Sequence, residues 1–244
     1  MIEARPLKST AEFREAVRLQ KEIWAFNDVE LLPVRLFVVA TKIGGQALGA
    51  FSGRKLIGFC LAIPGLKADG TPYLHSHMLG VSARYTNQGV GRMLKLEQRH
   101  DALARGLHLI EWTFDPLELK NAYFNIERLG AIVRRFVLNQ YGTTSSALHA
   151  GLPTDRCVAE WWISSLRVEA VLARQRPPLP PIEERISVPR EIAEIKKNNL
   201  RKARKIQRSV SEQFLRSFER GLVVLGFERS ESAGTYLLGQ WNYD

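Results

Sequence analysis

The sequence predicts an α/β protein of the α+β type, in which helices cover a mixed β-sheet. Two hairpin-forming strands come early in the chain, and strands that alternate with helices come later. Hairpins give antiparallel neighbours and crossover helices give parallel ones, so the sheet is expected to be mixed. A Pro-rich segment, RQRPPLPP at residues 174–181, then separates this region from a basic helix and a final hairpin.

The elements follow from local signals along the chain. Ser9 or Thr10 can cap a first helix that has Glu12 in its first turn and ends before Asn27. Further helices are expected over residues 33–41, 88–105 and 118–129. Strands are expected over residues 2–5, 45–52, 55–64, 73–81, 108–114, 131–139 and 156–164, with a loop of glycine, threonine and serine before the last one.

The same signals divide the chain into three regions. We predict a domain at 1–170, a stiff Pro-rich linker at 171–182 and a C-terminal extension at 183–244. The extension contains a basic helix near 190–220 and a closing β-hairpin. It either packs on the domain of its own chain or acts as a dimerisation arm, and the sequence leaves both open.

Composition limits the class of protein. Of the 244 residues, 45% are hydrophobic and 25% are charged, which is typical of a globular protein with a sizeable core. No apolar run approaches the roughly 20 residues that span a bilayer, and the charged N-terminus is unlike a secretory signal. Cys60 and Cys157 stand singly in apolar stretches, which indicates a reducing compartment and no zinc site. We expect a cytoplasmic protein without a metal or a membrane partner.

The formal net charge of +10 suggests an anionic partner. Much of the excess lies at 196–208, KKNNLRKARKIQR, which holds seven basic residues and no acid. Three interpretations stay open: a solvated helix face, attraction for an anionic cofactor or for a partner's acidic face, and nucleic-acid contact. The last is the least favoured, because no nucleic-acid motif and no interleaved aromatic residues accompany the run.

The segment LGVSARYTNQGVGRML, at residues 79–94, begins as a strand and continues as a helix. Gly89 and Gly91 stand where that helix begins, although glycine is a poor helix former. Backbone N–H groups at a helix start lack intrahelical partners, lie at the positive end of the dipole and can bind a diphosphate. A purely structural turn explains the glycines equally well. The pattern is neither a P-loop nor a dinucleotide fingerprint.

The wider pattern resembles a known motif. Leu79-x-Val81, Tyr85 and Gly89-x-Gly91, followed by a leucine, resemble the acetyl-CoA-binding motif of the GNAT superfamily of N-acyltransferases. The resemblance runs from the first strand to about residue 168. A second block, EWTFDPLELKNAYFNIERLGA at 111–131, together with a later LPTDR, is similar to one branch of uncharacterised predicted GNAT acetyltransferases.

This resemblance implies a GNAT fold in which the strand before the loop splays from its neighbour at a bulge. Pantetheine lies in the gap, and the diphosphate of acetyl-CoA or another acyl-CoA rests on the loop amides. The implied cofactor-binding residues are Leu79, Val81, Thr86, Asn87, Gln88, Gly89, Val90, Gly91, Arg92 and Asn121. Thr86 stands where the family usually has Arg or Gln. Its N–H can still serve, and Gln88 or Arg92 can replace the lost side-chain contact.

Amine acylation needs a base for the ammonium and an acid or other stabilisation for the leaving thiolate. The resemblance implies a Glu on a strand near the splay as the base and a Tyr on the following helix as the acid. The Tyr position falls on Ile126, which cannot donate a proton. Tyr123, three residues earlier on nearly the same helix face, is the substitute candidate.

Glu111 lies in the middle of an apolar strand, where a carboxylate is costly unless it is paired or functional. Strand alternation places His75, His77 and Leu79 on one face of the neighbouring strand. Histidine is suited to proton transfer near neutral pH, so Glu111 and His77 are the candidate bases. The alternative is that Glu111 pairs with a buried arginine and the histidines cap the sheet.

The sequence therefore predicts an acetyl-CoA-dependent N-acetyltransferase that acts on a primary amine by direct transfer in a ternary complex. The acceptor is a small-molecule or peptide amine, a homodimer is left open, and we do not expect a nucleic-acid partner. The alternative is a catalytically inactive protein on the same fold that binds acyl-CoA or a partner, which Ile126 favours.

Overall fold

A computed structural model describes residues 2–142 and 151–241, in two compact units. The first unit contains residues 2–111, and the second contains 112–142 and 151–241. The division falls within strand β5 (Leu109–Phe114). The three regions expected from the sequence, at 1–170, 171–182 and 183–244, stay a prediction. The expected C-terminal extension belongs to the same unit as 112–142. Most of the expected Gly/Thr/Ser loop, from 143 to 150, lies outside the described residues.

The sheet of the first unit has the order β1-β2-β3-β4-β5. Adjacent strands are antiparallel except β4 and β5, which run parallel with the pairs Leu74↔Ile110 and His75↔Glu111. The sheet is mixed, as predicted, because β2 and β3 form a hairpin while β5 follows a crossover helix. The remaining strands are β1 (Ile2–Pro6), β2 (Gln46–Ser52), β3 (Lys55–Leu66) and β4 (Pro72–Val81).

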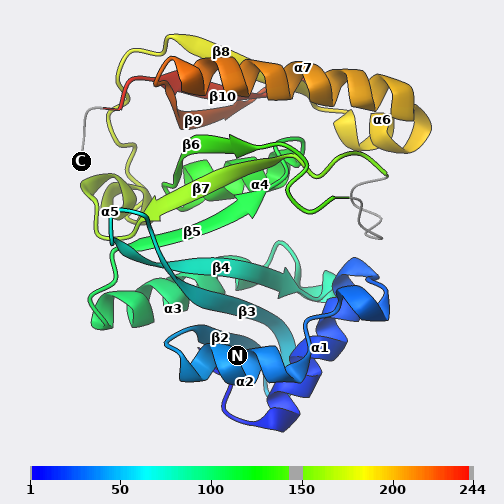
Figure 1. The fold of residues 1–244 in the computed structure, drawn as a ribbon, viewed down its shortest axis with the longest axis vertical. Coiled ribbons are helices and arrows are strands. Elements are labelled where there is room, and N and C mark those ends of the chain that lie inside the picture. The colour runs from blue at the N-terminus through cyan, green and yellow to red at the C-terminus, as the bar shows by residue number, and fades with distance from the viewer. Residues whose placement is uncertain (1, 143–150, 242–244) are drawn as a thin grey trace. The chain divides into compact units, whose positions relative to one another are not determined.

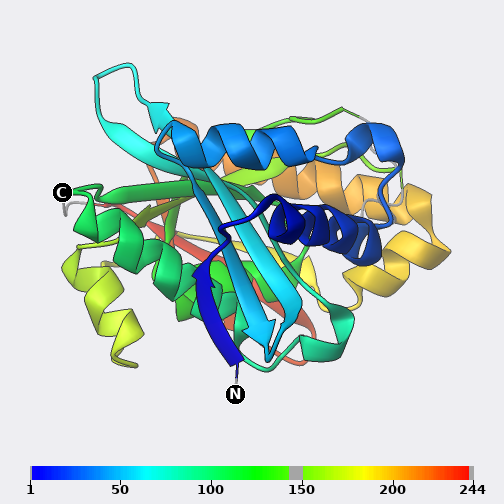
Figure 2. The ribbon, with the colours of Figure 1, turned by 90° about the horizontal axis from the view of Figure 1, so that it is seen from below.

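Helices cover both faces of this sheet (Figures 1 and 2). Helices α1 and α2 pack on one face over a core that includes Phe13, Phe37 and Phe59. Helix α3 packs on the other face, over Leu48 and Ile57. A capping box between Ser9 and Glu12 starts α1, so Ser9 is the N-cap of the two candidates, Ser9 and Thr10. The bounds are α1 (Thr10–Trp24), α2 (Val34–Lys42), α3 (Val90–Ala104) and the 3₁₀ turns η1 (Asp28–Glu30) and η2 (Ala83–Tyr85).

In the second unit the strand order is β5-β7-β6-β9-β10-β8. The C-terminal extension continues the sheet, because β9 pairs antiparallel with β6 at Val133↔Val224. The sequence predicted the β9–β10 hairpin but missed β8, which pairs antiparallel with β10. The strands are β6 (Ile132–Val137), β7 (Arg156–Trp162), β8 (Glu184–Pro189), β9 (Val223–Arg229) and β10 (Ala233–Gly239).

Two of the predicted helices are interrupted. The helix expected over 118–129 consists of α4 (Leu119–Tyr123) followed by a π-helical turn, η3 (Phe124–Arg128). The helix expected near 190–220 breaks at Asn199, whose side chain instead accepts a hydrogen bond from the Lys202 N–H and caps the second part. The remaining helices are α5 (Leu166–Leu172), which was not predicted, α6 (Ile192–Asn198) and α7 (Leu200–Glu219). Figure 1 shows α7 lying along β8 and β10.

The Pro-rich segment is packed on the second unit's sheet. A Cβ on Gly239 would lie 2.5 Å from the Pro181 carbonyl oxygen, and one on Gly226 would lie 3.4 Å from Leu179. These two glycines therefore leave the room that the segment occupies on β9 and β10. The Glu183 N–H also donates to the Leu238 carbonyl at 2.8 Å. Among the described residues, no helix combines the length and the apolar character needed to cross a membrane.

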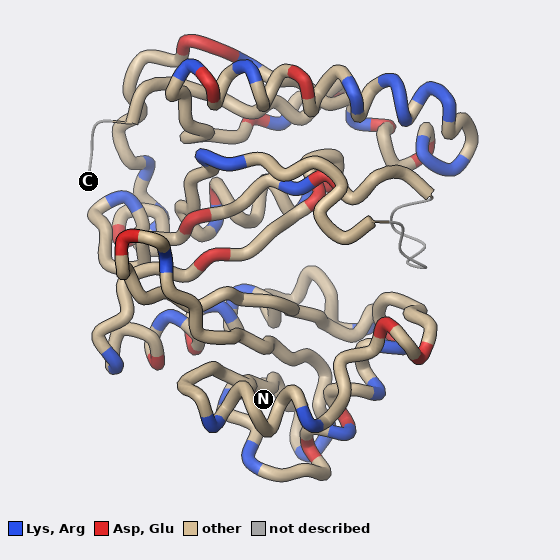
Figure 3. Tube along the Cα trace, in the orientation of Figure 1, with Lys and Arg blue, Asp and Glu red and all other residues tan. Residues whose placement is uncertain are grey.

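The basic run at 196–208 divides into two parts (Figure 3). Lys196 is only 5% exposed and forms ion pairs with Asp115 and Glu118, so it belongs to the core. The other six basic side chains are exposed on α6 and α7, as a solvated helix face requires: Lys197, Arg201, Lys202, Arg204, Lys205 and Arg208.

Candidate functional site

The loop between β4 and α3 is held to the sheet by its first residues. The Ser82 N–H donates to the Ile57 carbonyl at 2.8 Å, and the Tyr85 N–H donates to the Ser82 carbonyl at the same distance. The Ser82 hydroxyl donates to Glu22 on α1 at 2.7 Å. These bonds fix the direction in which the rest of the loop leaves the sheet.

Thr86 turns its polar groups inward. Its N–H donates to the Ala83 carbonyl at 3.4 Å, and its hydroxyl donates to the same oxygen at 2.9 Å. The Gln88 side chain likewise donates to the Arg84 carbonyl at 2.9 Å. The Thr86 N–H and the Gln88 side-chain amide therefore already have acceptors within the loop and are not open to a ligand. This differs from what the resemblance implies.

The next five N–H groups, from Asn87 to Gly91, make no hydrogen bond of ordinary geometry within the described part of the chain. The first bond of α3 runs from the Met93 N–H to the Gly89 carbonyl, and no side chain caps the helix. Residues 87–89 are exposed, and Arg92 follows in the first turn of α3. Consecutive open amides at the positive end of a helix form a binding site for an anion.

Glycine is suited to positions 89 and 91 of the loop for two different reasons. Gly89 has φ +81°, a left-handed conformation that glycine adopts without strain. Gly91 has no such φ, and a Cβ placed on it would meet only Leu79, at an ordinary 3.7 Å. The fold itself therefore accepts alanine at Gly91. The space above this residue is open to a ligand that must approach the backbone closely.

Below the loop, Leu79 and Val81 pack against the apolar cluster that α3 covers. Their strand, β4, contains a bulge. Leu61 pairs with Met78 and Ile63 pairs with His75, so two residues of β4, Ser76 and His77, lie opposite Ala62 alone. The bulge is the feature that the resemblance implies at this strand. The part of β5 beyond Glu111 belongs to the second unit, so the splay itself stays a prediction.

The bulge overturns the expected alternation along β4. Ser76 contacts Cys60 and Lys95 on the α3 side of the sheet, and Leu79 packs on the same side. Ser76 and Leu79 are three positions apart, so strict alternation would put them on opposite faces. His75, the neighbour of Ser76, therefore does not share a face with Leu79. The rings of His75 and His77 have centroids 5.9 Å apart.

Glu111 lies beside His75 in the parallel register and is 3% exposed. Its carboxylate forms an ion pair with Lys67 at 2.7 Å, where the sequence had suggested a buried arginine as the structural alternative. Lys67 belongs to the loop between β3 and β4. The ion pair accounts for the charge of a carboxylate in this position.

Burial is the main cause that lowers the pKa of both His75 and His77. For His75, the neighbouring His77 acts in the same direction and Glu111 acts against it. Because the pKa values lie below the usual value of 6.5, both imidazoles are mainly neutral at pH 7. A neutral imidazole can accept a proton from an ammonium group.

Asn121 and Tyr123 belong to the second unit, on α4. Asn121 is exposed, whereas Tyr123 is half-buried with the Arg229 guanidinium 3.6 Å from its ring centre. Ile126, at the position where the resemblance places a tyrosine, is fully buried in η3. The roles expected for Asn121 and Tyr123 stay predictions.

The sequence analysis missed Lys95, a buried cation beside the bulge. Its ammonium donates to the Ser76 hydroxyl at 2.9 Å and to the Gln98 side-chain oxygen at 3.0 Å. Burial lowers its pKa from 10.5 to about 8, partly offset by Cys60. The helical stripe Gly91, Lys95, Gln98 and Ala102 was the available signal, because it places Lys95 on the buried face. Among the described residues, no group of three or more His, Cys, Asp or Glu is placed to hold a metal ion.

Comparisons with solved structures identify the fold. No family model matches the chain, and no curated protein matches it at the sequence level. The ribosomal-protein-S18-alanine N-acetyltransferase from Escherichia coli matches 68% of this chain and 96% of its own at 18% identity, with a TM-score of 0.53. The acetyltransferase of the GNAT family from Streptococcus pneumoniae matches 66% and 98% at 15% identity, with a TM-score of 0.51.

A third structure, that of yncA from Salmonella typhimurium with its cofactor acetyl-CoA, matches 69% of this chain and 98% of its own. The identity is 14% and the TM-score is 0.54. The chain therefore has the fold of the GNAT acetyltransferases.

Proposed function

We propose that the loop at 87–91 binds the diphosphate of an acyl-CoA, and that the protein transfers the acetyl group of acetyl-CoA to a primary amine. The observation that carries the proposal is the exposed turn at 87–89, whose N–H groups make no hydrogen bond of ordinary geometry to a described residue, next to the open side of Gly91. A similar fold holds acetyl-CoA in one of the matched structures. Bound acetyl-CoA would supply a thioester as the acyl donor.

Of the two candidate bases, we favour His77. Glu111 is engaged with Lys67 and almost fully buried, whereas His77 is only partly buried and its pKa is lowered. In its neutral form it would accept the proton of the amine before direct attack in a ternary complex. Tyr123 remains the candidate acid for the thiolate, and backbone amides near the bulge are the alternative stabilising groups.

The Gly91→Ala substitution tests the diphosphate site. The added methyl group fills the space that a diphosphate needs, so calorimetric titration with acetyl-CoA should show a loss of affinity of about tenfold or more. The fold should be unaffected or slightly more stable, because alanine is the better helix former by roughly 1 kcal/mol. Affinity equal to that of the unchanged protein, or no acetyl-CoA binding by the unchanged protein, would contradict the proposal.

The His77→Gln substitution tests the base. We expect kcat/KM for amine acetylation to fall by about 10²-fold or more, the usual contribution of general base catalysis. In the unchanged protein kcat/KM should decline as the pH falls below the usual histidine value, because protonated imidazole cannot accept a proton. The affinity for acetyl-CoA serves as the control and should stay the same. If kcat/KM of the variant still falls at low pH, the base is another group. Glu111→Gln is then the next variant to measure.

A second candidate function is acyl-CoA binding without transfer, which the buried, apolar Ile126 favours. Release of free CoA thiol, measured with acetyl-CoA and a panel of primary amines, separates the two. A binding protein would give a calorimetric signal with acetyl-CoA and release no thiol with any amine. An acetyltransferase would release thiol in the presence of at least one amine of the panel. The structure of that amine would also identify the acceptor class.

A further inference from the structure

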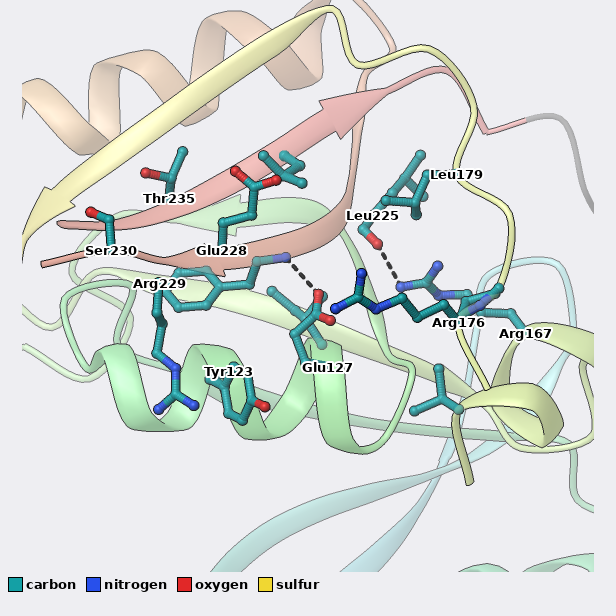
Figure 4. Close-up of a pocket in the computed structure, with 15 residues that line it drawn as sticks. Tyr123, Glu127, Arg167, Arg176, Leu179, Leu225, Glu228, Arg229, Ser230 and Thr235 are labelled. Carbon is teal, nitrogen blue, oxygen red and sulfur yellow. Dashed lines mark hydrogen bonds between the residues drawn. The ribbon is translucent and has the colours of Figure 1, made fainter. Parts of the chain in front are cut away.

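The second unit contains a pocket of about 610 Å³, which is within the usual size range of small-molecule sites (Figure 4). Its walls come from η3, the Pro-rich segment, α5 and the β9–β10 hairpin. All of its lining residues belong to the second unit, so it does not include the glycine loop. Apart from Tyr123, none of the site residues expected from the sequence lines it.

The walls of the pocket are held by contacts within the second unit. Pro177 and Leu179 line it from the Pro-rich segment, which the glycines of β9 and β10 hold in place. The opposite wall is the π-helical turn Phe124–Arg128. Such turns are rare in helices and occur frequently at functional sites. In η3 the turn carries Glu127, whose carboxylate accepts the Phe227 N–H at 2.7 Å and so joins this wall to β9.

Arg167 is a buried arginine that does not use all of its hydrogen-bond donors within the protein. Its Nε donates to the Gly130 carbonyl at 3.0 Å, and one terminal nitrogen donates to the Leu225 carbonyl at 2.6 Å. A guanidinium has five N–H donors, so these two bonds leave three for a ligand in the pocket that Arg167 lines. Burial lowers its pKa only to about 10, with Glu127 acting in the opposite direction, and the group stays charged at neutral pH.

Two more arginines line the pocket. Arg176, on the Pro-rich segment, is exposed and makes no hydrogen bond or ion pair with any described residue. Figure 4 shows Arg167 and Arg176 at one end and Arg229, over Tyr123, at the other. The two lining carboxylates already have partners: Glu127 accepts the β9 amide, and Glu228 pairs with Arg185 at 2.9 Å.

The rest of the lining is largely apolar. Leu225, Phe227 and Leu237 are buried residues of the hairpin, and Val171 faces the same pocket from α5. Arginine forks bind carboxylates and phosphates through paired charge-assisted hydrogen bonds. Leu225 and Leu179 lie beside Arg167 and Arg176, whereas Arg229 lies at the other end (Figure 4). An apolar wall next to two arginines suits a ligand with an apolar body and an anionic head.

We propose that this pocket binds a small amphipathic organic anion, with its carboxylate or phosphate held by Arg167 and Arg176 and its apolar body against Leu225 and Leu237. The site is independent of the proposed acetyl-CoA loop, because every residue that forms it lies in the second unit. Its test accordingly uses no CoA, so its failure and that of the proposed function are separate results.

The probes are hexanoate, hexyl phosphate and the neutral hexanamide, each titrated calorimetrically into the full chain. At least one anion should bind about tenfold more tightly than the amide, since only the anions use the arginines. The anion that binds more tightly identifies the head group. Equal affinity for the amide, or no saturable binding of either anion, would overturn the proposal.

Arg176→Ala should weaken binding of the preferred anion by about tenfold, and Arg176→Lys should recover part of the loss. Arg201→Ala is the matched control, because it removes an exposed arginine of the same unit that does not line the pocket. Both positions are exposed, so all variants should keep the melting temperature of the unchanged protein. If Arg176→Ala has no effect, or if Arg201→Ala weakens binding equally, the anion is not held where we place it.

Discussion

Each unit buries one lysine in its core, and the two lysines have opposite surroundings. Lys95, in the first unit, is 3% exposed and donates to a serine hydroxyl and a glutamine amide oxygen. Lys196, in the second, is 5% exposed and donates to the carboxylates of Asp115 and Glu118, each at 3.0 Å. The pKa of Lys95 is lowered to about 8, whereas that of Lys196 is raised.

The difference shows that burial alone does not decide the charge of a lysine. Desolvation opposes the charged form at both sites, and two carboxylates outweigh it at Lys196. Lys196 thus joins α6 to the turn that follows β5 by a charged contact. Lys95 is a cation whose charge changes near physiological pH, and it contacts Ser76 in the bulge of β4.

The largest effect is expected from Lys196→Ala. Removing one partner of a buried ion pair costs about 3–5 kcal/mol, because the remaining carboxylate stays buried without its cation. Urea unfolding of the full chain measures the loss. Lys197→Ala, at the exposed neighbouring position, is the control and should change the unfolding free energy by less than about 0.5 kcal/mol. A small loss for Lys196→Ala would mean that Asp115 does not depend on this lysine.

A second effect concerns pH. The unfolded chain binds the Lys95 proton with the usual pKa of 10.5 and the folded chain with about 8, so the unfolded state binds more protons between these values. The free energy of unfolding should therefore rise with pH, by about 2 kcal/mol between roughly pH 7 and 9.5. Lys95→Met should remove this rise, and the difference between the two proteins cancels the other titrating groups. Parallel pH curves would show that Lys95 titrates normally.

The smallest effect is expected from Glu118→Gln. The Glu118 side chain is 35% exposed, compared with 9% for Asp115, so water screens its contact with Lys196. The substitution keeps the shape and leaves Asp115 in place, and the loss should be about 0.5–1 kcal/mol. Asp115→Asn, measured in the same urea series, should cost clearly more. The reverse order would assign the main partner of Lys196 to Glu118.

Much of the fold follows from local signals in the sequence. Short-range bonds and φ determine the N-cap at Ser9 and the turn at Gly89. The sequence offered Ser9 or Thr10 as the N-cap, and a tight turn as one explanation of Gly89. The interruptions of the helices were not predicted. Asn199 ends α6 and caps α7 through a local bond from the Lys202 N–H, a signal that the pair Asn198–Asn199 carries and that the sequence analysis missed. No residue of FNIER marks the π-turn η3.

The site was predictable where it depends on the backbone and less so where it depends on side chains. The open amides at 87–91 follow from a strand, a glycine turn and a helix in succession. The bulge at Ser76 and His77 shifts the faces of β4 by one residue, and no feature of YLHSHMLGV marks it. None of the three interpretations of the basic run foresaw that Lys196 is buried, because its carboxylate partners lie about eighty positions away in sequence.

The pairing of β9 with β6 has a practical consequence for shortened forms of the protein. A chain cut at the Pro-rich segment would leave β6 as an open edge, and the apolar cluster of Ile132, Val223 and Leu225 would lose two of its three members. Exposed edges of this kind recruit strands from other molecules. Such a fragment should precipitate or form aggregates, and a search for the minimal active protein should keep the last sixty residues.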